Sequence, residues 1–173
     1  MPPSTSATRS EEFESGGPTR PAPVRRRPAV QGLAGGVVAT AVMTAYRLPA
    51  FRALPPTAEF WAAYVGEGDP EEHVAVGMVL HVLYGAGGGG LFGLAFDRLD
   101  FGTGTRRRWA GVVLGVAYGL LLAVVGTRVV FRRVLNERLD DDEAFVFVVG
   151  HAVYGIALGT WMVTRREFGD AYD

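Results

Sequence analysis

The sequence predicts an all-α fold, a four-helix transmembrane bundle. Of the 173 residues, 49% are hydrophobic and 20% are charged, but the charges are kept apart from the apolar runs. Residues 73–96, 109–127 and 144–164 contain no Asp, Glu, Lys or Arg, and residues 29–48 contain only Arg47. About 20 apolar residues are enough for a helix to cross the ~30 Å hydrocarbon core of a bilayer. We therefore expect four spans in the cell membrane, with the lipid bilayer as the main partner.

The composition disfavours several other classes of protein. A soluble bundle needs a polar stripe at helical spacing, and residues 109–127 offer only Tyr118 and the terminal Thr127. The absence of cysteine excludes disulfides, iron–sulfur clusters and thiol nucleophiles. A net charge of −1 gives no electrostatic basis for binding nucleic acid. No pattern of a nucleophile–base triad or phosphate loop is present, so we expect no catalytic residues, no metal, no cofactor and no enzyme activity.

The chain begins with a segment that is too polar to fold. Residues 1–28 are rich in Pro, Ser, Thr, Gly and charge, which predicts a disordered cytoplasmic tail. Its basic end before an apolar run is also typical of a cleaved export signal, with Ala39-x-Ala41 as a weak cleavage site. We favour an uncleaved first helix, at about 29–48, because three further spans follow it.

A proline-punctuated loop separates the first two spans. In it, Pro-Pro-Thr-Ala-Glu precedes an aromatic run and predicts a short helix capped at Thr57. This helix is expected to be an anchor at the headgroup level or, alternatively, a lid over a site. The second span, at about 71–96, follows Asp69-Pro70-Glu71-Glu72, in which Asp69 and Glu72 have the spacing of a capping box.

The third and fourth spans are expected at about 109–130 and 144–164, the fourth after an acidic cap at 140–143. A short tail, residues 167–173, ends the chain, so the transmembrane domain covers 29–166. More arginines flank the spans on the side of the N-terminus than on the other side. The positive-inside rule therefore predicts that both termini are cytoplasmic.

Small residues recur every fourth position in the first and third spans. The two stripes are Gly32, Gly36 and Thr40 in the first span, and Gly111, Gly115 and Gly119 in the third. Such stripes allow helices to pack closely, either within one chain or between the copies of a homo-oligomer.

The second and fourth spans share the motif His-x-x-Tyr-Gly. It occurs at His81, Tyr84 and Gly85 and again at residues 151–155, at nearly the same distance from an acidic cap. The match predicts two repeated helical hairpins, with both histidines at nearly equal depth because a helix rises about 1.5 Å per residue. Shared glycine-rich membrane composition is the alternative explanation.

Three roles are open for the polar residues of these spans. We favour a structural role, in which each neutral imidazole hydrogen-bonds a neighbouring helix through Thr44, Tyr118 or a carbonyl. The second role is a transporter or channel-like site near the bilayer centre, beside the helix-weakening tract 85–90. The third is a haem or metal site, although the spans supply no carboxylate. The candidate ligand-binding residues are His81, Tyr84, His151, Tyr154, and Arg47 and Arg128 at the outer mouth.

Several of these features together resemble one group of proteins. They are the run Leu54-Pro-Pro-Thr-Ala-Glu-Phe-Trp, the two His-x-x-Tyr-Gly motifs, the exclusive use of Arg as the basic residue and the acidic loops. The chain is similar over about residues 29–166 to small uncharacterised four-span membrane proteins of haloarchaea. The resemblance implies a membrane location and attaches no activity.

Overall fold

The computed structural model describes residues 27–48 and 56–169, and in these ranges every regular element is helical, as predicted. Nearly all of the predicted tail 1–28, and the chain from residue 170 onward, lie outside the described residues. The elements are α1 (Arg27–Arg47), α2 (Pro56–Tyr64), a 3₁₀ turn η1 (Pro70–His73), α3 (Val74–Asp97), α4 (Gly104–Val125), a π-helical segment η2 (Gly126–Leu135) and α5 (Asp141–Gly169).

Four of the described helices are long and apolar enough to cross a membrane. They cover Pro28–Arg47, Pro70–Asp97, Gly104–Leu135 and Asp141–Thr164. The third runs beyond the predicted range of 109–130 at both ends, since α4 begins at Gly104 and η2 continues it as far as Leu135. It stops at Asn136, whose backbone is left-handed with φ of 55°, a conformation that asparagine tolerates better than most residues.

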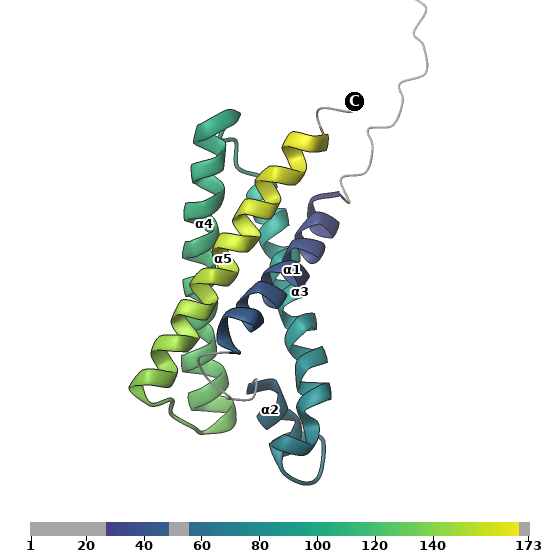
Figure 1. The fold of residues 1–173 in the computed structure, drawn as a ribbon, viewed down its shortest axis with the longest axis vertical. Coiled ribbons are helices and arrows are strands. Elements are labelled where there is room, and N and C mark those ends of the chain that lie inside the picture. Colours follow the sequence, from purple (N-terminus) through teal and green to yellow (C-terminus); the bar gives the residue numbers. More distant parts are fainter. Residues whose placement is uncertain (1–26, 49–55, 170–173) are drawn as a thin grey trace, which may run out of the picture.

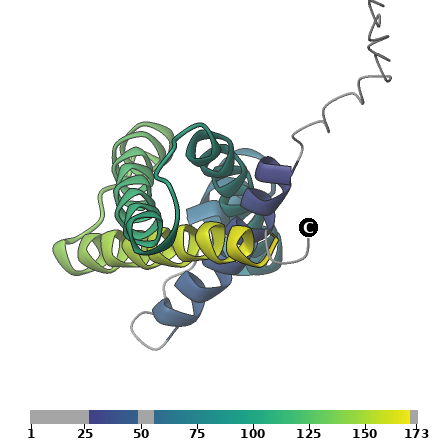
Figure 2. The same ribbon diagram turned by 90° about the horizontal axis from the view of Figure 1, so that it is seen from above.

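The long helices form two hairpins that join along one side. Helix α1 packs along α3, and α4 packs along α5, while α5 also crosses α1 (Figure 1). Seen along the bundle, α5 runs between the α4 side and the α1 side (Figure 2). Helices α3 and α4 make few backbone contacts with each other. Their line of approach is called the seam below, and the end of the bundle that carries α2 is called the α2 end.

The glycine stripes pack inside each hairpin and in the same register. A Cβ atom at Gly36 would overlap the carbonyl of Gly85, and one at Gly115 would overlap the carbonyl of Gly155. The glycine of each His-x-x-Tyr-Gly motif thus faces the middle glycine of the neighbouring stripe. This shared register fits the predicted repeat of two hairpins, and it buries the glycine faces within one chain.

The predicted caps have mixed outcomes. At the start of α5, the Glu143 N–H donates to Asp140 Oδ1 over 2.8 Å, and the Asp140 N–H faces Glu143 Oε2 at 3.4 Å. The capping box predicted at Asp69 is wrong, because Asp69 makes no side-chain cap bond and η1 begins there instead. The cap predicted at Thr57 is also wrong, since α2 begins one residue earlier, at Pro56, and the Thr57 hydroxyl donates to the carbonyl of Gly77 on α3, over 2.6 Å.

Candidate ligand-binding cavity

A cavity of about 190 Å³ lies in the seam, toward the α2 end. Most of its wall is apolar. The lining residues come from four parts of the chain and are Pro56, Thr57, Phe60, His81, Tyr84, Gly126, Val130, Phe131, Phe147 and His151.

Helix α2 forms one wall of this cavity and bridges the seam. Ala58 is fully buried against Gly77 of α3, where an added Cβ would lie 2.6 Å from the Ala58 Cβ. At the other end of α2, the Tyr64 hydroxyl donates to the carbonyl of Val134 in η2. The short helix predicted from the sequence is therefore fastened to both sides of the seam, with Phe60 facing the cavity between them.

Both motif histidines line the cavity, as expected if they lie at similar depth. His151 is buried, and its Nδ1 lies 2.8 Å from the carbonyl oxygen of Phe147, one turn earlier in α5. Since a carbonyl can only accept, Nδ1 is the donor, and the neutral ring keeps Nε2 as an acceptor. His81 makes no hydrogen bond with any residue in the described ranges, and Tyr118 donates to Gly88 over 2.8 Å. The histidine-to-neighbouring-helix bond expected from the sequence is thus not among the described contacts.

All four motif side chains meet in a small recess of about 10 Å³ behind the main cavity. Tyr154 is only 2% exposed, and its hydroxyl donates to the carbonyl of Gly85 over 2.7 Å. The tyrosine of the second motif therefore bonds the glycine of the first. Tyr84, its counterpart in the first motif, is 46% exposed and lines both the recess and the main cavity. The recess brings together His81, Tyr84, His151 and Tyr154, with Thr40, Met43, Gly85 and Leu122 around them.

The bundle is packed solid on the far side of this recess. A buried cluster from α1, α3 and α5 fills the half of the bundle away from α2, and its members are Ala39, Met43, Phe92, Phe96, Tyr154, Leu158, Met162 and Val163. This cluster therefore closes the bundle beyond the recess.

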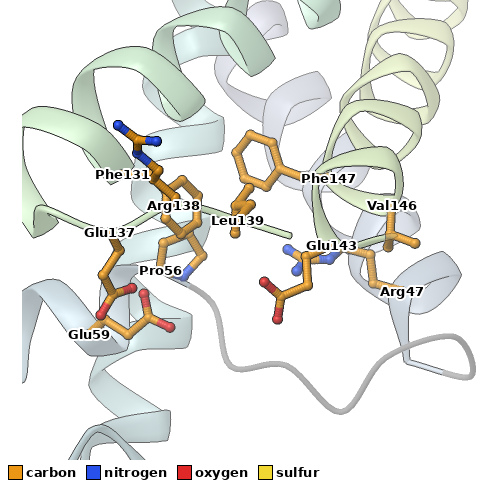
Figure 3. A pocket seen from close by; sticks show the side chains of 10 residues that line it. All are labelled: Arg47, Pro56, Glu59, Phe131, Glu137, Arg138, Leu139, Glu143, Val146 and Phe147. Carbon is orange, nitrogen blue, oxygen red and sulfur yellow. The ribbon is translucent and has the colours of Figure 1, made fainter. Parts of the chain in front are cut away.

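A second, polar cavity of about 110 Å³ lies next to the first at the α2 end (Figure 3). The two cavities share Pro56, Phe131 and Phe147 as lining residues. Its remaining lining residues are Arg47, Glu59, Glu137, Arg138, Leu139, Glu143 and Val146. Figure 3 shows the carboxylates of Glu59 and Glu137 turned toward each other, and Arg47 beside Glu143 on the opposite side. Of the two predicted arginines, Arg47 belongs to this cavity, whereas Arg128 is exposed on η2 and lines none of the three cavities described here.

Among the charged residues that line this polar cavity, Glu59 has the most unusual surroundings. Its Oε2 atom is buried and has no hydrogen-bond partner among the described residues. Burial, followed by the nearby Glu137 and Glu143 carboxylates, raises the pKa of Glu59 above its ordinary value, and Arg47 opposes this shift. Sequence reasoning missed Glu59, although a single carboxylate just before the aromatic run of the loop was a usable signal.

The cavity does not suit the haem reading. Within the described ranges, no group of three His, Asp or Glu side chains lies close enough to hold a metal ion. A cavity of about 150 Å³ accepts a molecule the size of benzene, so the 190 Å³ between α2, α3, η2 and α5 is far too small for a haem macrocycle.

Comparison with curated proteins and with solved structures gave no match. A family model, however, matches residues 26–167, a range that includes the two motifs, the cavities and all the described helices except the last two residues of α5. By this match, the chain belongs to the family of unknown function DUF6789.

Proposed function

We propose that this small four-span membrane protein binds a compact, largely apolar molecule that carries a hydrogen-bond donor, in the cavity between α2, α3, η2 and α5. The two imidazoles recognise the donor, and the apolar wall holds the rest of the molecule. This is a binding role and involves no chemical conversion. The cell membrane as location, cytoplasmic termini and a haloarchaeal origin stay predictions from the sequence.

The observation that carries the proposal is the state of the two histidines. Polar groups inside a membrane protein face its interior or a cavity and pair there, and here His151 is buried and His81 is half-buried. His151 has one nitrogen bonded to Phe147 and the other left as an acceptor, while His81 bonds no described residue. Both rings face the same apolar cavity. A ligand hydroxyl supplies the bond that the protein itself does not.

The volume of the cavity limits the size of the ligand. Pockets for drug-sized molecules span roughly 300–1,000 Å³, whereas this cavity has about 190 Å³. It matches a molecule with a single ring, or the end of a longer molecule that reaches in through the mouth. A phenol is a suitable probe, because it combines one apolar ring with one strong donor.

The test compares 4-fluorophenol with 4-fluorotoluene, a probe of similar size that lacks the donor. Their binding to the full-length protein in lipid nanodiscs is followed by ¹⁹F NMR, with empty nanodiscs as the baseline for partition into lipid. We expect a bound signal for the phenol that His81→Ala and His151→Ala each weaken at least tenfold. The matched control is His73→Ala, since His73 lies in η1 outside the cavity and bonds the Glu67 carbonyl. Equal binding of the two probes, or equal binding by all variants, contradicts the proposal.

Transport is the second candidate, and the place of the cavity between the two hairpins favours it. A transporter carries its site near the bilayer midplane and exposes it to one side at a time. Helix α3 is continuous through the glycine tract, so the tract does not form the interrupted helix that would mark a pathway. Instead, the hydroxyls of Tyr154 and Tyr118 brace it by donating to Gly85 and Gly88. Release to the other side requires these two bonds to break, so Tyr118→Phe should raise the flux of the phenol into proteoliposomes if transport occurs.

A further inference from the structure

Helix α2 contributes to the walls of both cavities at the α2 end. Besides Pro56, Thr57 and Phe60, which line the apolar cavity, α2 carries Glu59 into the polar cavity beside it. Its described attachments are one hydroxyl bond near each end, the contact of Ala58 with Gly77, and packing against α3, η1 and η2. A change in the interactions of Glu59 therefore acts directly on how firmly α2 closes the seam.

We propose that Glu59 is a proton-binding site that controls the docking of α2 over the cavity: the protonated carboxyl holds α2 closed, and the carboxylate releases it. This inference rests on the proposed function for its biological meaning, but the movement of α2 is measurable without any ligand.

The groups that face Glu59 support this direction. From the connection after η2 come Glu137 and Arg138, from α5 comes Glu143, and from α1 comes Arg47. Two carboxylates thus oppose a charge on Glu59, and Arg47 lies beside Glu143 rather than beside Glu59 (Figure 3). Oε2 is buried without a partner, which is costly for a charged oxygen and tolerable for a neutral one.

The other elements packed on α2 are α3, η1 and η2, and the three arginines of η2, Arg128, Arg132 and Arg133, are exposed. Helix α3 meets α2 at Gly77. The charged turn η1 lies at the far end of α2, where His73 approaches Gly66 and bonds the Glu67 carbonyl. Burial and the charges of Glu137, Glu143 and Arg47 therefore decide the behaviour of Glu59.

The sign of the pH effect follows from linkage. Because docking raises the pKa of Glu59, docking also favours proton uptake, and protonation favours docking. The docked state is most stable below the ordinary carboxyl pKa of about 4.3. It loses stability as the pH rises from there to the raised pKa of the docked state, and above that value no further loss occurs.

The absence of cysteine makes the movement of α2 directly measurable. Spin labels on Ala63→Cys in α2 and Val129→Cys in η2, both at exposed positions outside the cavities, report the distance across the seam by pulsed electron paramagnetic resonance. In full-length protein in nanodiscs, we expect a short distance at pH 4 and a larger share of long distances at pH 8. Glu59→Gln should keep the pH 4 distribution at pH 8.

Glu71→Gln is the matched control, since Glu71 is an exposed acid in η1, and it should leave the pH response unchanged. Distances that do not change with pH in the parent double variant overturn the proposal. So does a Glu59→Gln variant that responds to pH like its parent. A pH-dependent distance in a protein that binds neither fluorinated probe would refute the binding function alone, and bound phenol with a fixed distance would refute the proton switch alone.

Discussion

Replacing Gly36 by alanine tests the packing that places the two motifs. A Cβ at this position would lie 2.9 Å from the Cα of Ala86 and 3.0 Å from the carbonyl carbon of Gly85. These atoms belong to the backbone of α3 and cannot rotate away. Since carbon atoms pack best at about 3.5–4.0 Å, α1 and α3 must move apart by roughly 0.5–1 Å. Overpacking of this kind costs about 1–3 kcal/mol, so we expect Gly36→Ala to lower the free energy of unfolding by that amount.

Gly87→Ala is the matched control, because a Cβ at Gly87 meets nothing within 4 Å. It should leave stability unchanged or raise it by up to about 1 kcal/mol, the difference in helix propensity. The assay is reversible unfolding by SDS in mixed micelles, followed by far-ultraviolet circular dichroism. Gly115→Ala, the counterpart in the second hairpin, should behave like Gly36→Ala. If Gly36→Ala and Gly87→Ala have the same stability, the close approach of α1 and α3 does not hold the fold together.

Two further predictions use the same unfolding assay. Tyr154→Phe removes the buried bond to Gly85 and should lower the free energy of unfolding by about 0.5–1.5 kcal/mol. Tyr84→Phe should lower it little, and equal losses in the two variants would contradict the difference between the two motifs. Asp140→Ala removes the side-chain cap of α5 and should cost about 0.5–2 kcal/mol, while Asp69→Ala should be nearly neutral because its side chain caps nothing. A large loss for Asp69→Ala would show that the cap forms in solution.

The features that the sequence predicted well depend on spacing within one helix. Hydropathy located the four spans because a membrane span is a continuous apolar run. The four-residue spacing of the glycines identified the faces that pack in both hairpins. The fixed rise of a helix placed His81 and His151 on the same cavity, since both follow an acidic start by nearly equal lengths.

Hydropathy did not predict where a helix ends when the helix continues beyond its apolar residues. The segment after Val130 carries Arg132 and Arg133 and looked like a loop, but η2 continues through it by burying Phe131 and exposing the arginines. The two acidic starts look alike in sequence and differ in structure. After Asp69, the Glu72 N–H bonds the Asp69 carbonyl over 3.0 Å in a 3₁₀ turn, so this donor no longer needs the side chain.

The polar cavity at the α2 end could not be predicted from the sequence pattern of any one segment. Glu59, Glu137 and Glu143 come from separate connections and from the start of α5, and each is an ordinary surface acid within its own segment. Only the bridging of the seam by α2 brings Glu59 into the cavity with the other two. Its unusual environment is therefore a property of the tertiary fold.

The position of the cavity follows from where the two hairpins differ. A two-fold relation would make the contact of α3 with α4 equivalent to that of α1 with α5, yet only the second is close. Because Gly36 is equivalent to Gly115 and Gly85 to Gly155, Ala39 corresponds to Tyr118, and Leu158 corresponds to Gly88. In the close interface, Ala39 of α1 and Leu158 of α5 belong to one buried cluster.

At the seam the large and small side chains change places: Tyr118 of α4 corresponds to Ala39, and Gly88 of α3 corresponds to Leu158. Tyr118 of α4 reaches across to α3, donating to the Gly88 carbonyl and packing its ring 5.2 Å from that of Phe92. A long side chain on α4 thus spans the space that a methyl group spans on α1, and its hydrogen bond joins α4 to α3 at this level. The two hairpins can therefore share one architecture and still form a cavity at only one of their two interfaces. The α1–α5 interface is close, whereas the α3–α4 interface is wider and contains the cavity. The proposed ligand cavity, α2 and Glu59 all lie along this wider interface, so the proposed binding site depends on the difference between the two hairpins rather than on the parts that they share.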